Sequence, residues 1–212
     1  MDAVVHIIDD DESIRHALDS LFRSVDLETR LYRSPQDFLA APRPDCPSCL
    51  VLDIRLQGIS GLDFQDRLAQ QNIHVPVVLI TGHGDIPMSV RGMKAGAVDF
   101  LTKPFRDQDI LDAVGVAIEK DRARRNEDRE ANEIRKRFAA LTPRERQVMA
   151  LVTAGKMNKQ VAGLLNLSEI TVKIHRGQAM RKMGARTLAD LVRMSSDLQL
   201  TPASVLTDHP FV

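Results

Sequence analysis

The sequence predicts an α/β fold with a doubly wound, five-stranded parallel sheet, followed by a small all-α domain. Two observations carry this prediction. Over about the first 120 residues, short and almost continuous apolar runs alternate with helical patterns, as parallel strands covered on both faces require. After residue 137, four short helical patterns follow one another with no strand pattern between them.

Five apolar runs are expected to form the strands, at residues 4–8, 29–32, 50–52, 75–80 and 100–101. The helices between them are expected at residues 13–25, 35–40 with Ser34 as the N-cap, 62–71, 88–95, and from about Asp107 onward. The strand order 2-1-3-4-5 places strands one and three side by side where the order reverses.

Residues 119–137 are expected to form a helical linker. They carry 8 Lys+Arg and 6 Asp+Glu, and neither Gly nor Pro occurs from Val116 to Thr142. Ala, Glu, Arg and Lys favour helix, so the fifth helix should continue through this segment. No apolar heptad keeps its register, which favours a solvated helix, although a dimeric coiled coil remains an alternative.

The last part of the chain predicts four short helices. Thr142, Pro143 and Glu145 form a capping box with proline at the first helical position, a sharp helix start. That helix can end at Gly155, and the next ones are expected at 159–165, from the Ser168 cap to about 183, and from about 187. We therefore divide the chain into an α/β domain (1–118), a charged linker (119–137), a helical domain (138–202) and a tail (203–212).

The net charge of zero hides an uneven distribution. Residues 1–118 carry 11 Lys+Arg against 18 Asp+Glu, whereas residues 138–212 carry 10 against 5. A basic domain can bind nucleic acid. No apolar run is long enough for a membrane span and the N-terminus lacks the order of a signal peptide, so we expect a cytoplasmic protein with no membrane partner.

The two cysteines form a single C-x-x-C, Cys46 and Cys49. A zinc site needs about four ligands, and no second pair exists. A redox motif normally opens a helix, whereas this one leads into a predicted strand. We expect both thiols to be structural.

Acidic residues follow two neighbouring strands of the predicted sheet. Asp9, Asp10 and Asp11 come directly after the first strand, and Asp53 ends the third. Ligands in open α/β sheets collect at this switch point, so the carboxylates should converge. Their mutual repulsion calls for a cation, and oxygen ligands with open positions suit Mg²⁺.

The other strand ends add a hydroxyl and an ammonium at the same edge. Strand four ends at Thr81 and strand five leads to Lys103. Carboxylates, a divalent cation, a hydroxyl and a lysine are the groups that phosphoryl transfer to an aspartate requires. Each group alone has a simpler interpretation: Asp9 to Asp11 suit a helix N-terminus, and Lys103 suits an exposed surface.

The stretches IIDDDE, LVLDIR, LITGHG and KAGAVDFLTKPF resemble the receiver domain of two-component response regulators over residues 1 to about 122, and TGHGDIPM is similar to the FixJ branch. The resemblance implies Asp53 as the phosphoacceptor, with Asp9, Asp10 and the Arg55 carbonyl as further ligands of Mg²⁺. It also implies that Thr81 and Phe100 are switch residues and that Lys103, before a cis proline, binds the phosphate. Asp11 would contribute only to the field.

One departure from that family concerns the loop after Asp53. The family usually has a proline at the position of Gln57, as in MPxMSG, whereas this chain has Gln57 followed by Gly58. Without the proline the loop should be more flexible. No acid, hydroxyl or metal ligand is lost, so we expect altered phosphorylation or dephosphorylation kinetics rather than loss of the site.

The stretch from LTPRERQVM to LADLV resembles the LuxR-type helix-turn-helix of the NarL/FixJ family over about residues 137–202. In the third helix, Val172, His175, Ala179 and Met183 can face the core, which leaves a polar, basic face for a major groove. By family position, Lys173, Ile174 and Gly177 face bases, and Lys159, Thr171, Arg176 and Lys182 lie nearer phosphates. A helical bundle that binds protein is the alternative from charge alone.

We therefore expect a response regulator rather than an enzyme. A sensor histidine kinase would phosphorylate Asp53 with Mg²⁺, helix four and strand five would form a homodimer, and the dimer would bind double-stranded DNA in a sequence-specific way to regulate transcription. RNA polymerase is a further candidate partner. Two rivals remain: a regulator that works without phosphate, and an aspartate-nucleophile hydrolase, which generally needs a second acid where this chain has Arg55.

Overall fold

The computed structural model describes residues 3–203. The chain divides into two compact units, one ending at Asn126 and the other beginning at Glu127, and we describe each by itself. The boundaries predicted after residues 118 and 137 both fall inside helix α5 (Asp107–Ala139) and stay predictions. The tail from residue 204 onward lies outside the described residues.

The first unit contains a five-stranded parallel sheet with the order β2-β1-β3-β4-β5, as predicted. The strands are β1 (Val4–Ile8), β2 (Glu28–Tyr32), β3 (Ser48–Asp53), β4 (Val77–Thr81) and β5 (Asp99–Thr102). The helices are α1 (Glu12–Arg23), α2 (Pro35–Ala40), α3 (Gly61–Gln70), α4 (Ile86–Lys94) and the first part of α5. Ile8 pairs with Leu52 across β1 and β3, so Asp9 follows beside Asp53.

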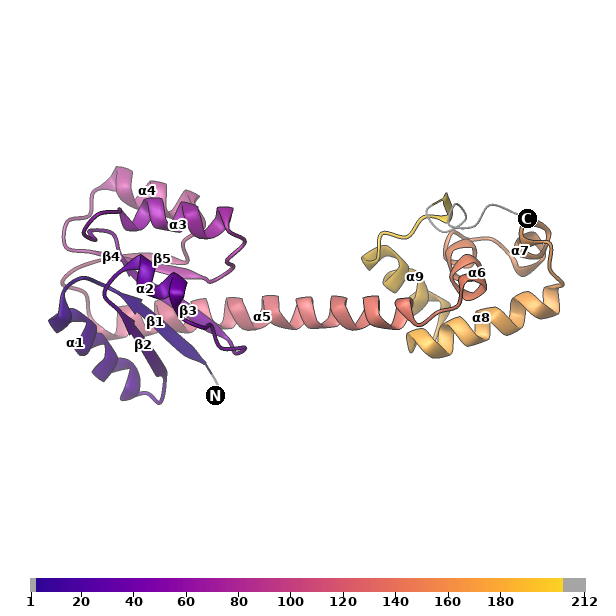
Figure 1. Cartoon of the computed structure of the whole chain (residues 1–212), viewed down its shortest axis with the longest axis horizontal. Helices are drawn as coiled ribbons and strands as arrows, with labels where there is room; N and C mark the ends of the chain where they lie inside the picture. Colours follow the sequence, from indigo (N-terminus) through magenta and orange to yellow (C-terminus); the bar gives the residue numbers. More distant parts are fainter. Residues whose placement is uncertain (1–2, 204–212) are drawn as a thin grey trace. The chain divides into compact units, whose positions relative to one another are not determined.

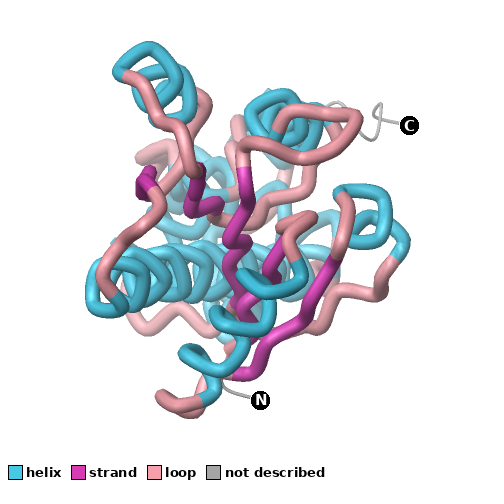
Figure 2. Tube along the Cα trace, turned by 90° about the vertical axis from the view of Figure 1, so that its left-hand side faces the viewer, coloured by secondary structure: helices cyan, strands magenta, loops and turns pink. Residues whose placement is uncertain are grey.

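Helices cover both faces of this sheet (Figures 1 and 2). One apolar cluster packs strand residues such as Ile7 and Val51 against α1 and α5. A second cluster packs Leu50 and Leu79 against α2, α3 and α4. Both faces are buried, which is the physical reason for the almost continuous apolar runs in the sequence.

Several elements begin one or two residues away from the expected positions, among them β3, which begins at Ser48 and not at Leu50. Strand β4 begins at Val77 and not at Val75, since Pro76 has no N–H to donate to the sheet. Helix α4 begins at Ile86 and not at Met88. Its N-cap is Asp85, whose carboxylate accepts a hydrogen bond from the Met88 N–H at 2.7 Å.

The first part of α5 belongs to the first unit. Its inner face, including Ile110 and Val114, is buried against the sheet. At its end lies Asp121, a buried carboxylate that accepts hydrogen bonds from the Ser48 N–H (2.9 Å), Arg124 (2.6 Å) and Arg125 (2.7 Å). Charge and hydrogen bonding are thus satisfied inside the protein, and α5 is fastened to the start of β3.

Cys46 and Cys49 are both free thiols and both buried. Burial, followed by the negative charge of Asp121, raises the pKa of the Cys49 thiol far above its ordinary value. A thiol held protonated is a poor nucleophile and a poor metal ligand, as expected for a structural cysteine.

Up to residue 203, the second unit contains four helices after α5: α6 (Pro143–Thr153), α7 (Asn158–Leu165), α8 (Glu169–Met183) and α9 (Leu188–Asp197). The predicted capping box is present, with Thr142 and Glu145 bonding each other's backbone N–H. Helix α7 ends at Leu165, its C-cap Asn166 adopts the left-handed conformation, and Ser168 caps α8. A short turn therefore separates α7 from α8, as in a helix-turn-helix.

The last part of α5 belongs to the second unit. Ile134 and Phe138 lie against its apolar core. Arg137 donates a hydrogen bond to the Met183 carbonyl at 3.2 Å, at the C-terminus of α8. The residues between, from Asn126 to Glu130, are exposed, as expected for a solvated linker.

In the part of the chain that the structure describes, no helix combines the length and the apolar character needed to cross a membrane.

Candidate functional site

Three carboxylates meet at the carboxyl edge of the sheet. Asp9 follows β1 and is fully buried, and Asp53 ends β3 and is 6% exposed. Asp10 is half-buried beside them. One carboxylate oxygen from each of the three residues lies within 4.8 Å of the others. The convergence expected from the strand order is therefore present.

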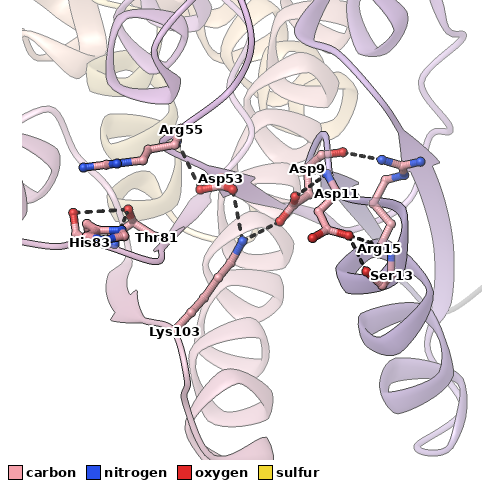
Figure 3. A network of polar contacts seen from close by, with 9 residues as sticks. All are labelled: Asp9, Asp11, Ser13, Arg15, Asp53, Arg55, Thr81, His83 and Lys103. Atoms are coloured by element: carbon pink, nitrogen blue, oxygen red, sulfur yellow. Dashed lines mark hydrogen bonds and ion pairs between the residues drawn. The ribbon is translucent and has the colours of Figure 1, made fainter.

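Lys103 joins two of these carboxylates (Figure 3). Its Nζ atom donates to Asp9 Oδ2 at 2.7 Å and to Asp53 Oδ2 at 3.0 Å. Lys103 follows β5 and precedes Pro104 across a cis peptide bond. The lysine is therefore part of the carboxylate cluster, and the simpler interpretation of an exposed surface lysine does not apply.

Burial and charge oppose each other in this cluster. Burial raises the pKa of the Asp9 carboxyl above its ordinary value, and the hydrogen bonds from Lys103 and from the Asp11 N–H offset this only in part. Burial by itself would lower the pKa of Lys103, but Asp9 and Asp53 outweigh it and raise that pKa. The ammonium thus stays charged, while three carboxylates still outnumber it by two.

Backbone groups fix the orientation of the acids. The Asp9 carboxylate accepts from the Asp11 N–H at 2.9 Å, and the Asp53 carboxylate accepts from the Arg55 N–H at 3.1 Å. Arg15 donates to the Asp9 carbonyl at 2.7 Å, a contact that no local sequence pattern indicated. Asp11 points away and caps α1 by accepting from the Ser13 N–H. The N-cap hydrogen bond accounts for an aspartate at this position, so Asp11 is not needed as a metal ligand.

The carboxylate cluster fits a divalent cation. Asp9, Asp10 and Asp53 offer oxygen atoms, the ligands that Mg²⁺ prefers. Asp10 lines an open pocket of about 400 Å³ together with Arg55, so the cluster can be approached from solvent at Asp10. The excess negative charge of the cluster supplies the electrostatic reason for a cation there.

Thr81 is buried at the end of β4, but its hydroxyl is engaged within its own turn (Figure 3). Its Oγ1 atom accepts from the His83 N–H at 3.3 Å. Phe100 is half-buried on β5, next to the loop that follows Thr81. A Cβ atom added to Gly84 would lie 2.9 Å from the Phe100 ring, so this glycine leaves room for close packing between loop and ring.

The loop that contains Gln57 and Gly58 borders the same pocket. Gly58 has φ = +92°, a conformation that glycine adopts without strain. Gly61 begins α3 directly against β3, since an added Cβ would lie only 2.3 Å from the Asp53 carbonyl oxygen. The backbone thus requires glycine at both positions for different reasons, a positive φ at Gly58 and close packing at Gly61. Gln57, which precedes Gly58, is exposed.

Helix α8 of the second unit has the two faces expected from its sequence. Val172, Ala179 and Met183 are fully buried, and His175 is half-buried. Lys173, Ile174 and Gly177 are exposed, and Lys159 is exposed on α7. Thr171 and Arg176 are half-buried, and Arg176 lies 3.5 Å from the Asn158 side chain.

Lys182, a predicted DNA contact, forms an ion pair within the protein. Its Nζ atom donates to Glu145 at 2.7 Å, and Glu145 is buried at the capping box of α6. Burial by itself would raise the pKa of Glu145, but Lys182 and the Thr142 N–H outweigh it and lower that pKa. The pair fastens α8 to α6, which competes with a phosphate-binding role for Lys182.

Comparisons with known families cover both units. The sequence model of the family described as "Response regulator receiver domain" matches residues 5–115. The model described as "Bacterial regulatory proteins, luxR family" matches residues 139–195. A receiver domain followed by a LuxR-type DNA-binding domain defines a class of transcription regulators, not of enzymes.

Full-length relatives show the same arrangement. The chain is 57% identical to "Nodulation protein W" of Bradyrhizobium diazoefficiens over 94% of this chain and 88% of that protein. It is 41% identical to "Transcriptional regulatory protein FixJ" of Rhizobium meliloti, over 92% of this chain and 95% of that one. The chain therefore belongs to the NarL/FixJ family of two-component response regulators.

Solved structures resemble the chain as well. The response regulator StyR superimposes with a TM-score of 0.83 at 42% identity, over 92% of this chain and 99% of that one. Full-length FixJ from B. japonicum gives a TM-score of 0.56 at 36% identity, over 92% of this chain and 97% of that one. The receiver domain implies a histidine kinase as partner, and the helix-turn-helix implies DNA binding.

Proposed function

We propose that Asp53 accepts a phosphoryl group from a sensor histidine kinase in a Mg²⁺-dependent reaction, and that phosphorylation promotes dimerisation and sequence-specific DNA binding. The observation that carries the proposal is the Lys103 ammonium, hydrogen-bonded to both Asp9 and Asp53 beside Asp10. An aspartate held next to an ammonium and two further acids has the surroundings that phosphoryl transfer needs.

The chemistry assigns one role to each group. A carboxylate oxygen of Asp53 forms a bond to phosphorus while the bond between phosphorus and the kinase histidine nitrogen breaks, and its electron pair stays on that nitrogen. Asp9, Asp10, Asp53 and the Arg55 carbonyl would hold Mg²⁺, which supplies positive charge to the phosphoryl oxygens. Lys103 would leave Asp9 for a phosphoryl oxygen and stabilise the acyl phosphate.

Thr81 and Phe100 would transmit the change. The Thr81 hydroxyl, now bonded within its own turn, would donate to a phosphoryl oxygen instead. Its loop would then move, and the packing between Gly84 and the Phe100 ring would give the ring a new position. The surface of α4 and β5 changes with it, which favours a homodimer.

The dimer would place two α8 helices on a two-fold related DNA site. Lys173, Ile174 and Gly177 would face bases, whereas Lys159, Thr171 and Arg176 would lie nearer phosphates, with a weaker case for Lys182. Because phosphate contacts release counterions, binding should weaken strongly as salt rises. RNA polymerase is the further partner through which a bound dimer would regulate transcription.

The test combines mass measurement and DNA binding on the full-length protein. Incubation with acetyl phosphate and Mg²⁺ should add about 80 Da, the mass of one phosphoryl group, and should strengthen binding to DNA fragments selected by the phosphorylated protein. Asp53→Asn should show neither effect. Asp11→Asn is the matched control, because asparagine caps a helix as well as aspartate does and Asp11 lies outside the cluster.

The rival functions give different results in the same experiment. A regulator that works without phosphate would bind DNA equally well before and after incubation. A hydrolase would turn over many equivalents of phosphoester without a stable adduct. Either result, or an adduct that persists in Asp53→Asn, would overturn the proposal.

A further inference from the structure

The outward face of α8 begins with two exposed isoleucines. Ile170 and Ile174 are 73% and 54% exposed. With Gly177 and Arg181 they follow one another at spacings of four, three and four residues, which places all four along one line of the helix. The first two turns of this line thus present apolar side chains to solvent.

The orientation of this line is fixed by the opposite side of the helix. Val172, Ala179 and Met183 are fully buried in the core of the second unit. The Ser168 side chain accepts from the Thr171 N–H at 3.1 Å and sets the first turn. Isoleucine is also stiff at χ1 in a helix. The two isoleucines are therefore held outward in the unbound protein and need little ordering on binding.

We infer that Ile170 and Ile174 determine DNA sequence by contacting thymine methyl groups in the major groove. The inference rests on the proposed DNA binding and goes beyond it, by naming the base chemistry that is read. The second unit matches a DNA-binding family and carries a positive net charge, which favours DNA as the occupant of this face.

The chemistry of the base edges decides what these side chains can read. Isoleucine has no hydrogen-bonding group, so it cannot distinguish the donors and acceptors of the bases. In the major groove, the apolar group on a base edge of unmodified DNA is the C5-methyl of thymine. An Ile side chain placed against a polar edge would bury that edge without a partner, which is unfavourable.

Gly177 fits the same arrangement. An added Cβ at this position would meet nothing within 4 Å, so the packing of the protein does not require a glycine here. Glycine costs helix stability, about 1 kcal/mol relative to alanine. Its small size lets the helix backbone lie deeper in a groove, which brings the Ile174 turn closer to the base edges.

The spacing gives a prediction for the DNA. Four residues of helix span about 6 Å, and base pairs follow one another at about 3.4 Å. Two contacted thymines should therefore lie about two base pairs apart in each half-site, on either strand.

The experiment removes the methyl groups from the DNA. Sites are first selected from random double-stranded DNA by the full-length phosphorylated protein. Each thymine is then replaced by deoxyuridine, which lacks only the methyl group and keeps its pairing edge. We expect the dissociation constant of the wild type to rise about three- to tenfold at one position for each isoleucine.

Variants assign each methyl group to its side chain. At the base pair that Ile174 contacts, Ile174→Ala should bind DNA with thymine or with uracil equally well, and it should still prefer thymine at the base pair that Ile170 contacts. Ile170→Ala should lose the preference for thymine only at its own base pair. Leu164→Ala is the matched control, because Leu164 is 52% exposed on α7 and should leave both discriminations unchanged.

The outcomes separate this inference from the proposed function. Tight, phosphorylation-dependent binding that ignores every thymine-to-uracil change would overturn the inference and leave the function standing. Discrimination that survives in both isoleucine variants would also overturn it. Failure to bind any selected DNA would instead count against the proposed function.

Discussion

At the scale of single residues, Lys103 links the two buried acids of the candidate site. Its ammonium lies between Asp9 and Asp53, so two buried acids share one cation. One ammonium neutralises only part of the negative charge of the two acids, so the site favours a further cation. A surface lysine with one acidic partner would have no such consequence.

His6 is a second residue whose surroundings have measurable effects. It is buried on β1, shares a hydrogen bond of 3.1 Å with the Tyr32 hydroxyl, and packs on Phe38. Burial, followed by the charges of Arg30 and Arg43, lowers the pKa of His6 from 6.5 to about 4. The folded protein therefore keeps this histidine neutral at pH values where the unfolded chain protonates it.

This pKa shift predicts a loss of stability in acid. Below pH 6.5 the unfolded chain gains a proton at His6 that the folded chain does not take up until about pH 4, so the free energy of unfolding falls across that window. His6 should contribute a loss of about 2 kcal/mol between pH 7 and pH 5. Urea unfolding at pH 7 and pH 5 measures this loss in the free energy of unfolding. The fluorescence of Tyr32 reports the transition, because Tyr32 is the one tyrosine in a chain without tryptophan.

The variant His6→Asn should remove this part of the pH dependence, since asparagine keeps a hydrogen-bonding group and does not titrate. The control is His16→Asn on the exposed side of α1, which should retain the pH dependence of the wild type. Equal slopes for wild type and His6→Asn would show that His6 does not carry the effect.

At the scale of elements, the caps and the loop after β3 connect sequence to site. Ser34, Ser168 and the Thr142 capping box begin their helices where the sequence predicts. The loop from Leu56 to Ser60 is different, because it borders the carboxylate cluster and lacks the proline common in its family. The effect of Gln57 and Gly58 on the phosphate lifetime stays a prediction.

Gln57→Pro tests that loop. The Gln57 N–H donates to no residue of the described chain, so proline should be tolerated while it fixes φ near −65°. Fewer loop conformations should admit less water to the acyl phosphate, and we expect its half-life to lengthen severalfold. The decay of the phosphorylated protein after removal of the donor, followed by mass, measures this.

Gln57→Ala is the control, because it removes the same amide without fixing the backbone. Its half-life should stay near that of the wild type. If alanine and proline lengthen the half-life equally, then the side chain rather than the backbone controls the lifetime.

At the scale of the whole molecule, the question is how phosphorylation leads to assembly. Helix α4 exposes Ile86, Val90 and Met93 at spacings of four and three residues, an apolar line on one face. We expect two copies of this chain to bury that face together after phosphorylation. Movement of Thr81 and Phe100 would reposition this exposed face for pairing.

Val90→Asp should prevent this association. A carboxylate in an apolar interface loses its hydration without a partner, so the dimer should weaken at least tenfold while Asp53 is still phosphorylated. Sedimentation velocity with and without acetyl phosphate measures the dimer. Val116→Asp is the matched control, since Val116 is 61% exposed on α5, away from α4. A phosphorylated Val90→Asp protein that dimerises like the wild type would contradict the proposed interface.

The sequence by itself determined the fold class, the two-part organisation, the helix caps at Ser34, Thr142 and Ser168, and the family. These features depend on patterns within a few residues, such as an apolar run that ends at an acid or a threonine three residues before a glutamate. The cluster of Asp9, Asp10 and Asp53 could be predicted for the same reason, because parallel strands bring their ends to one edge.

The tertiary structure alone decided which groups meet across the chain. Asp121 is 73 residues from Ser48, and Lys182 is 37 from Glu145. His6 likewise finds Tyr32 only because β1 and β2 pair in one register. Contacts of this kind depend on register, burial and helix rotation together, and no local pattern encodes their combination.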